Sequence, residues 1–150
     1  METAKQLSGS LVNKPGRLVA MLAGLSKGKV TLRALAVMDS GDRGTVRFVP
    51  DDANTAISVL KTLGISCQAT NVLLVDVPRQ VGAFCNICER LAGDHLNIDY
   101  AYSSFSERGA KGGLAVIKVN NLSKAQHVLA ENGANSARKQ FPTRRLLRAR

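Results

Sequence analysis

The strongest candidate for chemistry in this sequence is a junction of six residues, Asn13-Lys14-Pro15-Gly16-Arg17-Leu18. Pro15 fixes the backbone angle φ and suits a helix start, while Gly16 lets the backbone approach another group closely. The first N–H groups of a helix have no partner within it, so they favour an anion such as a carboxylate. Asn13 can donate and accept hydrogen bonds. The junction therefore indicates a carboxylate-binding turn, although turn chemistry alone also explains a Pro-Gly pair.

A second candidate is the Cys85-Asn86-Ile87-Cys88 element, which has the spacing of a redox pair or of half a zinc site. A structural zinc site needs four ligands, and the remaining cysteine and the two histidines form no second close pair. Cys88 falls on the apolar face of an expected helix, which favours a core position. A thiol near a helix N-terminus can have a lowered pKa, which keeps redox sensing open. We expect neither a metal nor a cofactor.

Tyr100, Tyr102 and Phe105 alternate along an expected strand, as do the aromatic side chains that stack bases in some RNA-binding sheets. The consensus of those sheets is missing, and aromatic residues on a sheet also pack against helices or a partner sheet. The sequence contains no nucleophile elbow, phosphate-binding loop or carboxylate dyad. These observations do not favour an enzyme.

The elements that must position these residues occur twice along the chain. Gly16 and Gly82 each follow a strand-like run and precede apolar residues at helical spacing. These glycines are 66 positions apart, and the same offset relates Leu25 to Leu91. After a hairpin that is three residues longer in the second copy, an offset of 69 relates other apolar positions. Such matches, with one insertion confined to a turn, indicate a duplicated fold.

Each copy predicts the order strand, helix, strand, strand, helix, strand, which is a ferredoxin-like βαββαβ unit. The strands of the first copy are expected over residues 6–12, 31–38, 45–49 and 65–69, and its helices over 18–25 and 56–63. We expect Gly28 to close the first of these helices as a left-handed C-cap and Gly64 to end the second. The second copy predicts strands over residues 72–77, 97–105, 114–119 and, weakly, 134–137, and helices over 83–92 and 123–131.

The expected fold class is therefore α+β, with two ferredoxin-like βαββαβ units in tandem, antiparallel sheets and helices on one face. The units are residues 1–70 and 71–137, and a basic C-terminal tail, residues 138–150, is expected to be disordered.

The junction and its duplicated frame resemble the ACT domain, a regulatory module that binds amino acids. Lys29 to Leu35 resembles the segment that opens the second strand in that family, and Leu96 to Tyr102 resembles it better. The likeness covers roughly residues 5–133 and is to small stand-alone proteins of two ACT units. It implies a non-enzymatic regulatory or sensor protein that binds an amino acid or similar small carboxylate, and a homodimer.

In that family the ligand usually lies where the first loop of one unit faces the second strand or helix of a neighbour. Two positions depart from the family pattern: Val81 stands where proline is usual, and Thr31 stands where asparagine is usual. The resemblance therefore implies either one or two competent ligand sites per chain, with no preference between them. A single site would pair the first junction with the strand of the second copy. The implied ligand-binding residues are Asn13, Lys14, Pro15, Gly16, Arg17 and Leu18, with Asn97 and Ile98 from the other copy, and Gly82 in the second junction.

The net charge is +10, which raises the alternative of a nucleic-acid partner. Six of the cations follow Ala134 without any acid, so the preceding residues carry fifteen cations against eleven acids. An RNA-associated protein that uses the aromatic residues and the basic tail therefore stays an alternative, as does a regulatory subunit of an enzyme chain. We expect no membrane association and a cytoplasmic location, because no apolar run spans a membrane and the N-terminus lacks a secretory signal.

Overall fold

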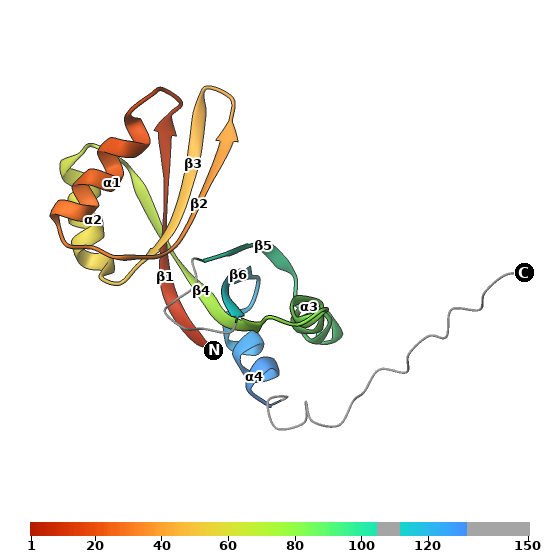
Figure 1. The fold of residues 1–150 in the computed structure, drawn as a ribbon. Helices are drawn as coiled ribbons and strands as arrows, with labels where there is room; N and C mark the ends of the chain where they lie inside the picture. Colours follow the sequence, from red (N-terminus) through yellow and green to blue (C-terminus); the bar gives the residue numbers. More distant parts are fainter. Residues whose placement is uncertain (105–111, 132–150) are drawn as a thin grey trace, which may run out of the picture.

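The computed structural model describes residues 1–104 and 112–131, which form one six-stranded antiparallel sheet with four helices (Figure 1). The strand order is β2-β3-β1-β4-β6-β5. The α+β, ferredoxin-like class that the sequence predicts is confirmed. The elements are β1 (Glu2–Val12), α1 (Arg17–Lys27), β2 (Leu32–Ser40), β3 (Arg43–Pro50), α2 (Ala53–Thr62), β4 (Cys67–Pro78), α3 (Ala83–Gly93), β5 (Ile98–Ser103), β6 (Gly112–Val119) and α4 (Leu122–Glu131).

In the first unit, α1 and α2 pack on β1, β3 and β2. Leu7 and Leu11 alternate along β1 and point to the helices, where Met21 and Leu25 of α1 are fully buried against them. Phe48 of β3 lies directly opposite Leu7 and is also buried. Burial of each such side chain contributes about 1.5–3 kcal/mol, so this cluster is the main source of stability in the unit.

The prediction for the end of α1 was wrong in one detail. Gly28 follows the helix but has a φ of −76°, and the left-handed residue is Lys29, with a φ of 57°. A Cβ atom on Gly28 would lie 2.9 Å from Cγ2 of Val59, so a glycine is needed there for the close approach of α2. Gly64, with a φ of 73°, follows α2 as predicted.

The second unit repeats the arrangement, with α3 and α4 on β4, β6 and β5. Leu73 of β4 pairs with Ile117 of β6, and both are fully buried. Ile87 and Leu91 of α3 and Leu129 of α4 cover them. The helical spacing of the apolar residues in α3 thus places its buried stripe on the sheet, as the sequence predicts.

β4 belongs to both units. The sequence predicts separate strands over residues 65–69 and 72–77, whereas one continuous strand runs from Cys67 to Pro78. The boundary expected between residues 70 and 71 therefore lies inside a strand. The start of β1, from Glu2 to Lys5, pairs with residues 71–74 and so lies where the second unit would have its fourth strand. The two expected sheets are consequently joined into one.

All four helices lie on one face of this sheet, because the residues that contact the two helix pairs share the same alternation along β1 and β4. The opposite face, here called the helix-free face, has an apolar cluster of its own. Ala34 and Val49 of the first unit pack there against Val72, Leu74 and Val116. Strand twist curls the sheet, so that the edge of the first unit meets the second unit on this face.

Three predictions lie outside the described residues: the strand over 134–137, the tail 138–150 and most of the hairpin between the strands expected over 97–105 and 114–119. Within the described residues, no helix has the length and apolar character that a membrane span requires.

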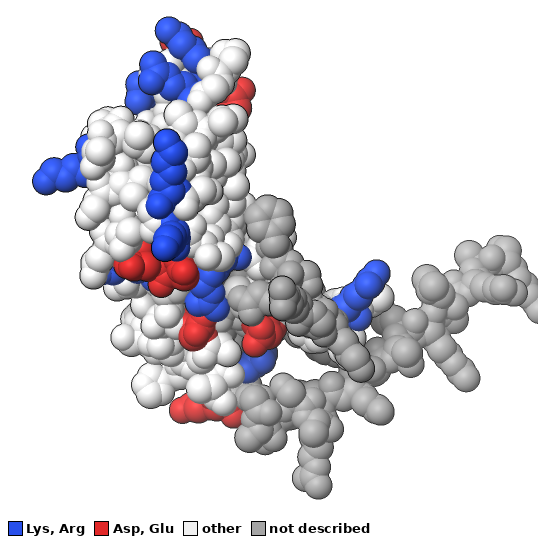
Figure 2. Space-filling view, turned by 60° about the vertical axis from the view of Figure 1, so that its left-hand side comes forward, with Lys and Arg blue, Asp and Glu red and all other residues white. Residues whose placement is uncertain are grey.

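Figure 2 shows Lys and Arg side chains on the first unit separated by uncharged ones, not gathered into one basic patch on that face.

Candidate ligand-binding site

The first junction is a tight turn between β1 and α1. The N–H group of Lys14 donates to the carbonyl oxygen of Val12 at 2.8 Å, and that of Arg17 donates to Lys14 at 3.3 Å. Gly16 has a φ of 84°, which a residue with a side chain rarely adopts. No atom lies within 4 Å of the place of a Cβ on Gly16, so the glycine is needed for the backbone angle and not for space.

The side chains of the first junction are mostly exposed. Asn13 donates from Nδ2 to the carbonyl oxygen of Gly41 at 3.3 Å, which ties the junction to the turn between β2 and β3. Lys14 and Arg17 are exposed cations. Arg43, which follows the same turn, donates to the hydroxyl and carbonyl oxygens of Ser10. Two acids of that turn, Asp39 and Asp42, lie beside these cations, so the surface around the junction carries both signs of charge. The exposed side chains of the junction form no enclosed wall.

The second junction, Arg79 to Ala83, has the same backbone. Gln80 donates to the carbonyl oxygen of Pro78 at 2.8 Å, and Ala83 donates to Gln80 at 3.2 Å. Gly82 has a φ of 80° and an open Cβ position. The second junction has Val81 where the first has Pro15, yet the turn is the same. The reason is that the positive φ of the turn is adopted by a glycine in both copies.

An apolar cavity of about 380 Å³ opens beside the second junction. Phe84, in the first turn of α3, forms one wall and is partly exposed. Val77 at the end of β4 and Ala101 of β5 also line the cavity. The N–H group of Ala83 donates to Gln80, whereas those of Phe84 and Cys85, next in the first turn of α3, have no acceptor within the helix. A carboxylate next to Phe84 would therefore find donors there. Sequence reasoning missed this cavity, because strands and a helix far apart in the chain enclose it.

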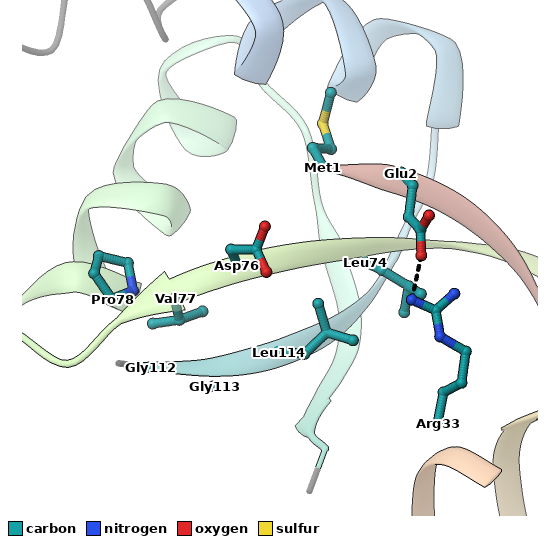
Figure 3. A pocket seen from close by; sticks show the side chains of 10 residues that line it. All are labelled: Met1, Glu2, Arg33, Leu74, Asp76, Val77, Pro78, Gly112, Gly113 and Leu114. Carbon is teal, nitrogen blue, oxygen red and sulfur yellow. Dashed lines mark ion pairs between the residues drawn. The ribbon is translucent and has the colours of Figure 1, made fainter. Parts of the chain in front are cut away.

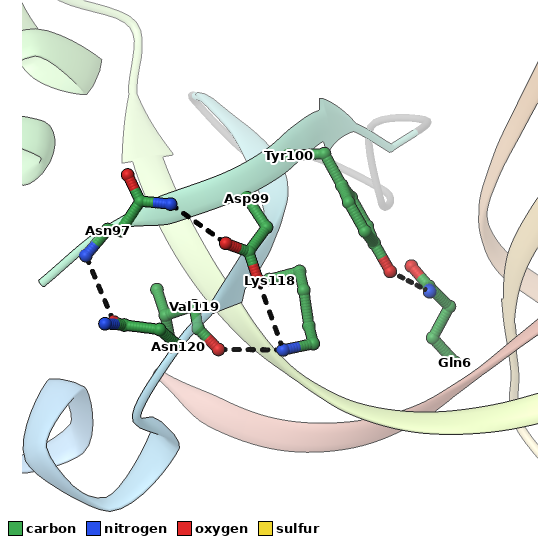
Figure 4. Close-up of polar contacts among 7 residues, drawn as sticks. All are labelled: Gln6, Asn97, Asp99, Tyr100, Lys118, Val119 and Asn120. Carbon is green, nitrogen blue, oxygen red and sulfur yellow. Dashed lines mark hydrogen bonds and ion pairs between the residues drawn. The ribbon is translucent and has the colours of Figure 1, made fainter.

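Ile98 is the first residue of β5, and Asn97 directly precedes it. Figure 4 shows the polar contacts of Asn97. The N–H group of Asn97 donates to Oδ1 of Asn120 at 3.1 Å, and Asn97 Nδ2 donates to Asp99 Oδ1 at 2.9 Å. Lys118 Nζ lies 3.5 Å from Asp99 Oδ2 in an ion pair. The first unit has a hydrogen bond at the equivalent place, where the N–H group of Thr31 donates to Asp51 Oδ1 at 2.9 Å. The side chain of Asn97 thus helps to hold its own strand.

Within one chain, the first junction lies far from Asn97. Ile98 pairs with Val119, two residues beyond Ile117, which pairs with Leu73 of β4. Continuing that register by two residues reaches Asn71, which pairs with Lys5. Lys5 precedes Asn13 by eight residues of extended strand, or roughly 26 Å. A site that unites the first junction with this strand therefore requires two chains.

The tyrosines that the RNA alternative would use are engaged inside the chain. Gln6 of β1 is fully buried, and its Nε2 donates to the Tyr100 hydroxyl at 2.6 Å (Figure 4). Its Oε1 accepts from the Tyr102 hydroxyl at 2.8 Å. The guanidinium of Arg47 lies over the Tyr100 ring, 4.0 Å from its centre. Burial, and then the neighbouring Tyr100, raise the pKa of Tyr102. These rings join the two units, and Phe105 lies outside the described residues.

The cysteine pair does not have the surroundings of a reactive site. Cys85 is exposed, and its thiol points to Glu89 Oε1 at 3.7 Å. Burial, and then Cys85, raise the pKa of Cys88, which disfavours the thiolate that redox chemistry and metal binding need. In the part of the chain that the structure describes, no three His, Cys, Asp or Glu residues cluster as metal ligands.

Residues 2–140 match the family model of the ACT domain pair. The chain belongs to the ACT domain pair family. Protein BT0572 from Bacteroides thetaiotaomicron is 31% identical to it and has a TM-score of 0.80, over 87% of this chain and 89% of that one. The ACT domain is a regulatory rather than a catalytic module.

Two further structures share the fold. The regulatory subunit of aspartate kinase from Thermus thermophilus, in its ligand-free form, has a TM-score of 0.64 and 16% identity over 89% of this chain and 91% of that one. The corresponding subunit from Thermus flavus has a TM-score of 0.62 and 14% identity over 89% and 93%. No curated protein matches the sequence.

Proposed function

We propose that this ACT domain pair is a non-enzymatic regulatory protein that binds an α-amino acid with an apolar side chain. The observation that carries the proposal is the apolar cavity at the start of α3, next to a turn held open by Gly82. The carboxylate of the ligand accepts from N–H groups in the first turn of α3, and its side chain lies against Phe84 and Val77.

The first junction, with Asn13, Lys14, Gly16 and Arg17, stays a second proposed site. Its side chains are exposed in one chain, so it requires a partner to cover the ligand. The edge strands β2 and β5 have one pairing side each without a neighbouring strand among the described residues, which supports a homodimer. Asn97 and Ile98 of the partner chain would then face the first junction, as the family resemblance implies.

The first experiment is a thermal-shift screen of the twenty amino acids on the full chain. A ligand at about 100 times its Kd stabilises the folded state by about 2.7 kcal/mol, which raises the Tm of a chain of this size by roughly 5–10 °C. We expect an apolar amino acid to produce such a shift, and no shift from any amino acid would refute the proposed function.

Matched variants of the two junctions then locate the site. Gly82→Asp adds a carboxylate beside the proposed ligand carboxylate and should abolish binding in titration calorimetry, whereas Gly16→Asp makes the same change without the cavity and should retain it. Gly82→Ala controls for backbone strain, since its Cβ meets no other atom. Phe84→Ala should weaken binding about tenfold or more, because it removes a wall of the cavity. Loss with Gly16→Asp alone would instead assign the site to the first junction.

A further inference from the structure

Two of the residues that line the cavity beside α3 also take part in the contact between the two units. Tyr102 of β5 and Leu114 of β6 line this cavity. Both also pack against the apolar cluster of the helix-free face, to which the first unit contributes Ala34 and Val49. The wall of the proposed amino-acid site is therefore continuous with the contact that joins the units.

Leu114 borders the first unit as well as the cavity. It lines a second hollow, of about 520 Å³, together with Arg33 of β2 (Figure 3). Arg33 forms an ion pair there with Glu2 of β1. Val77 lines both spaces in the same way as Leu114. A change in how the first unit lies against the second would consequently move residues that line the proposed amino-acid site.

Tyr102 is held from the first unit by the amide of Gln6. The Tyr102 hydroxyl donates to Gln6 Oε1 at 2.8 Å, and Gln6 Nε2 donates to the Tyr100 hydroxyl at 2.6 Å. Gln6 is fully buried and is not among the described residues that line the cavity. Displacing either ring would leave a buried polar group without its partner, so the two hydrogen bonds together resist movement of Tyr102.

We propose that Gln6 of the first unit is a positioning residue for the amino-acid site of the second unit and acts through the hydroxyl of Tyr102. This inference rests on the proposed function, because it concerns the same cavity. A wall that is already held in place costs less to order when the amino acid binds, so the affinity is higher with the hydrogen bond than without it. By linkage, a bound amino acid stabilises the contact between the units by the same factor.

The test compares two matched tyrosine variants of the full chain by titration calorimetry. The probes are L-valine, L-leucine, L-isoleucine, L-methionine and L-phenylalanine. Tyr102→Phe and Tyr100→Phe each remove one hydroxyl that is bonded to Gln6, but of these two tyrosines only Tyr102 lines the cavity. We expect Tyr102→Phe to weaken binding about fivefold or more and Tyr100→Phe to change it by less than about twofold. A contact that served stability alone would affect the two variants equally.

Variants of Gln6 complete the test. Gln6→Leu should weaken binding at least as much as Tyr102→Phe does, whereas Gln68→Leu, at an exposed position on the neighbouring strand, should leave it unchanged. When Tyr102→Phe is already present, Gln6→Leu should add little, because the effect passes through the missing hydroxyl.

The outcomes separate the two proposals. If the wild type binds one of the five amino acids and Tyr102→Phe binds it with the same affinity, the positioning role is refuted and the proposed function stands. If the wild type binds none of them, the proposed function is refuted and the positioning role with it. Far-UV circular dichroism of each variant verifies that a loss of binding is not a loss of the fold.

Discussion

The contact of Gln6 with Tyr100 and Tyr102 joins the two units, and replacing Gln6 by leucine tests its contribution. Gln6 is fully buried and makes two side-chain hydrogen bonds, at 2.6 and 2.8 Å. A hydrogen bond in a protein contributes about 0.5–1.5 kcal/mol net, so Gln6→Leu should lower the free energy of unfolding by about 1–3 kcal/mol. The loss arises because both tyrosine hydroxyls are left without their partner.

Urea unfolding at 25 °C, followed by far-UV circular dichroism, measures this change. Tyrosine fluorescence gives a second signal in Gln6→Leu, since the chain has two tyrosines and no tryptophan, and both tyrosines lie in this contact. Gln68→Leu is the matched control, because Gln68 is exposed on the neighbouring strand and its replacement should change stability by less than about 0.5 kcal/mol.

The triple variant, in which Tyr100→Phe and Tyr102→Phe are added to Gln6→Leu, separates unpaired hydroxyls from poor packing. Replacing all partners by apolar groups of similar shape can be nearly neutral, so the triple variant should regain about half of the loss or more. If Gln6→Leu lies within 0.5 kcal/mol of the wild type, or if the triple variant is no more stable than the single one, the hydrogen bonds do not hold the units together.

The same contact and the start of β6 give two further predictions. The pKa of Tyr102 is raised above the ordinary value of 10.0, so the unfolded state loses this proton at a lower pH than the folded state does. The free energy of unfolding should therefore be unaffected below about pH 10 and fall as the pH rises further. This fall should be less steep in Tyr102→Phe. A slope that Tyr102→Phe leaves unchanged would show that other groups cause it. Gly112→Ala should cost roughly 2 kcal/mol, because its Cβ would lie 2.3 Å from the Val77 carbonyl oxygen, whereas Gly113→Ala meets no atom and should be nearly neutral. Urea unfolding of the pair checks this, and equal losses would contradict the geometry.

Much of the fold follows from local patterns. The alternation of Leu7 and Leu11, the helical spacing of Leu25 and Leu91, and the turn glycines depend on residues a few positions apart, so their signals are visible along the chain. The duplicated junctions, with Gly16 and Gly82 at nearly the same φ, were expected for this reason. The end of α1 was misread, since Gly28 meets a contact with α2 that no local pattern reveals.

The candidate sites were less predictable. Gly82 was expected at a possible ligand site, but the cavity beside it depends on β4, β5 and α3 meeting in space. Whether Asn97 and the first junction meet across two chains stays a prediction.

The sequence alone determined the duplicated βαββαβ order, the ACT likeness and the two glycine turns, because strand alternation, helical spacing and φ preferences are local properties of the chain. Only the tertiary structure decided that the units share β1 and β4 in one sheet, that the tyrosines lie against Gln6, and where cavities open. Those features depend on strand register and on accumulated twist, which arise from pairing between distant segments.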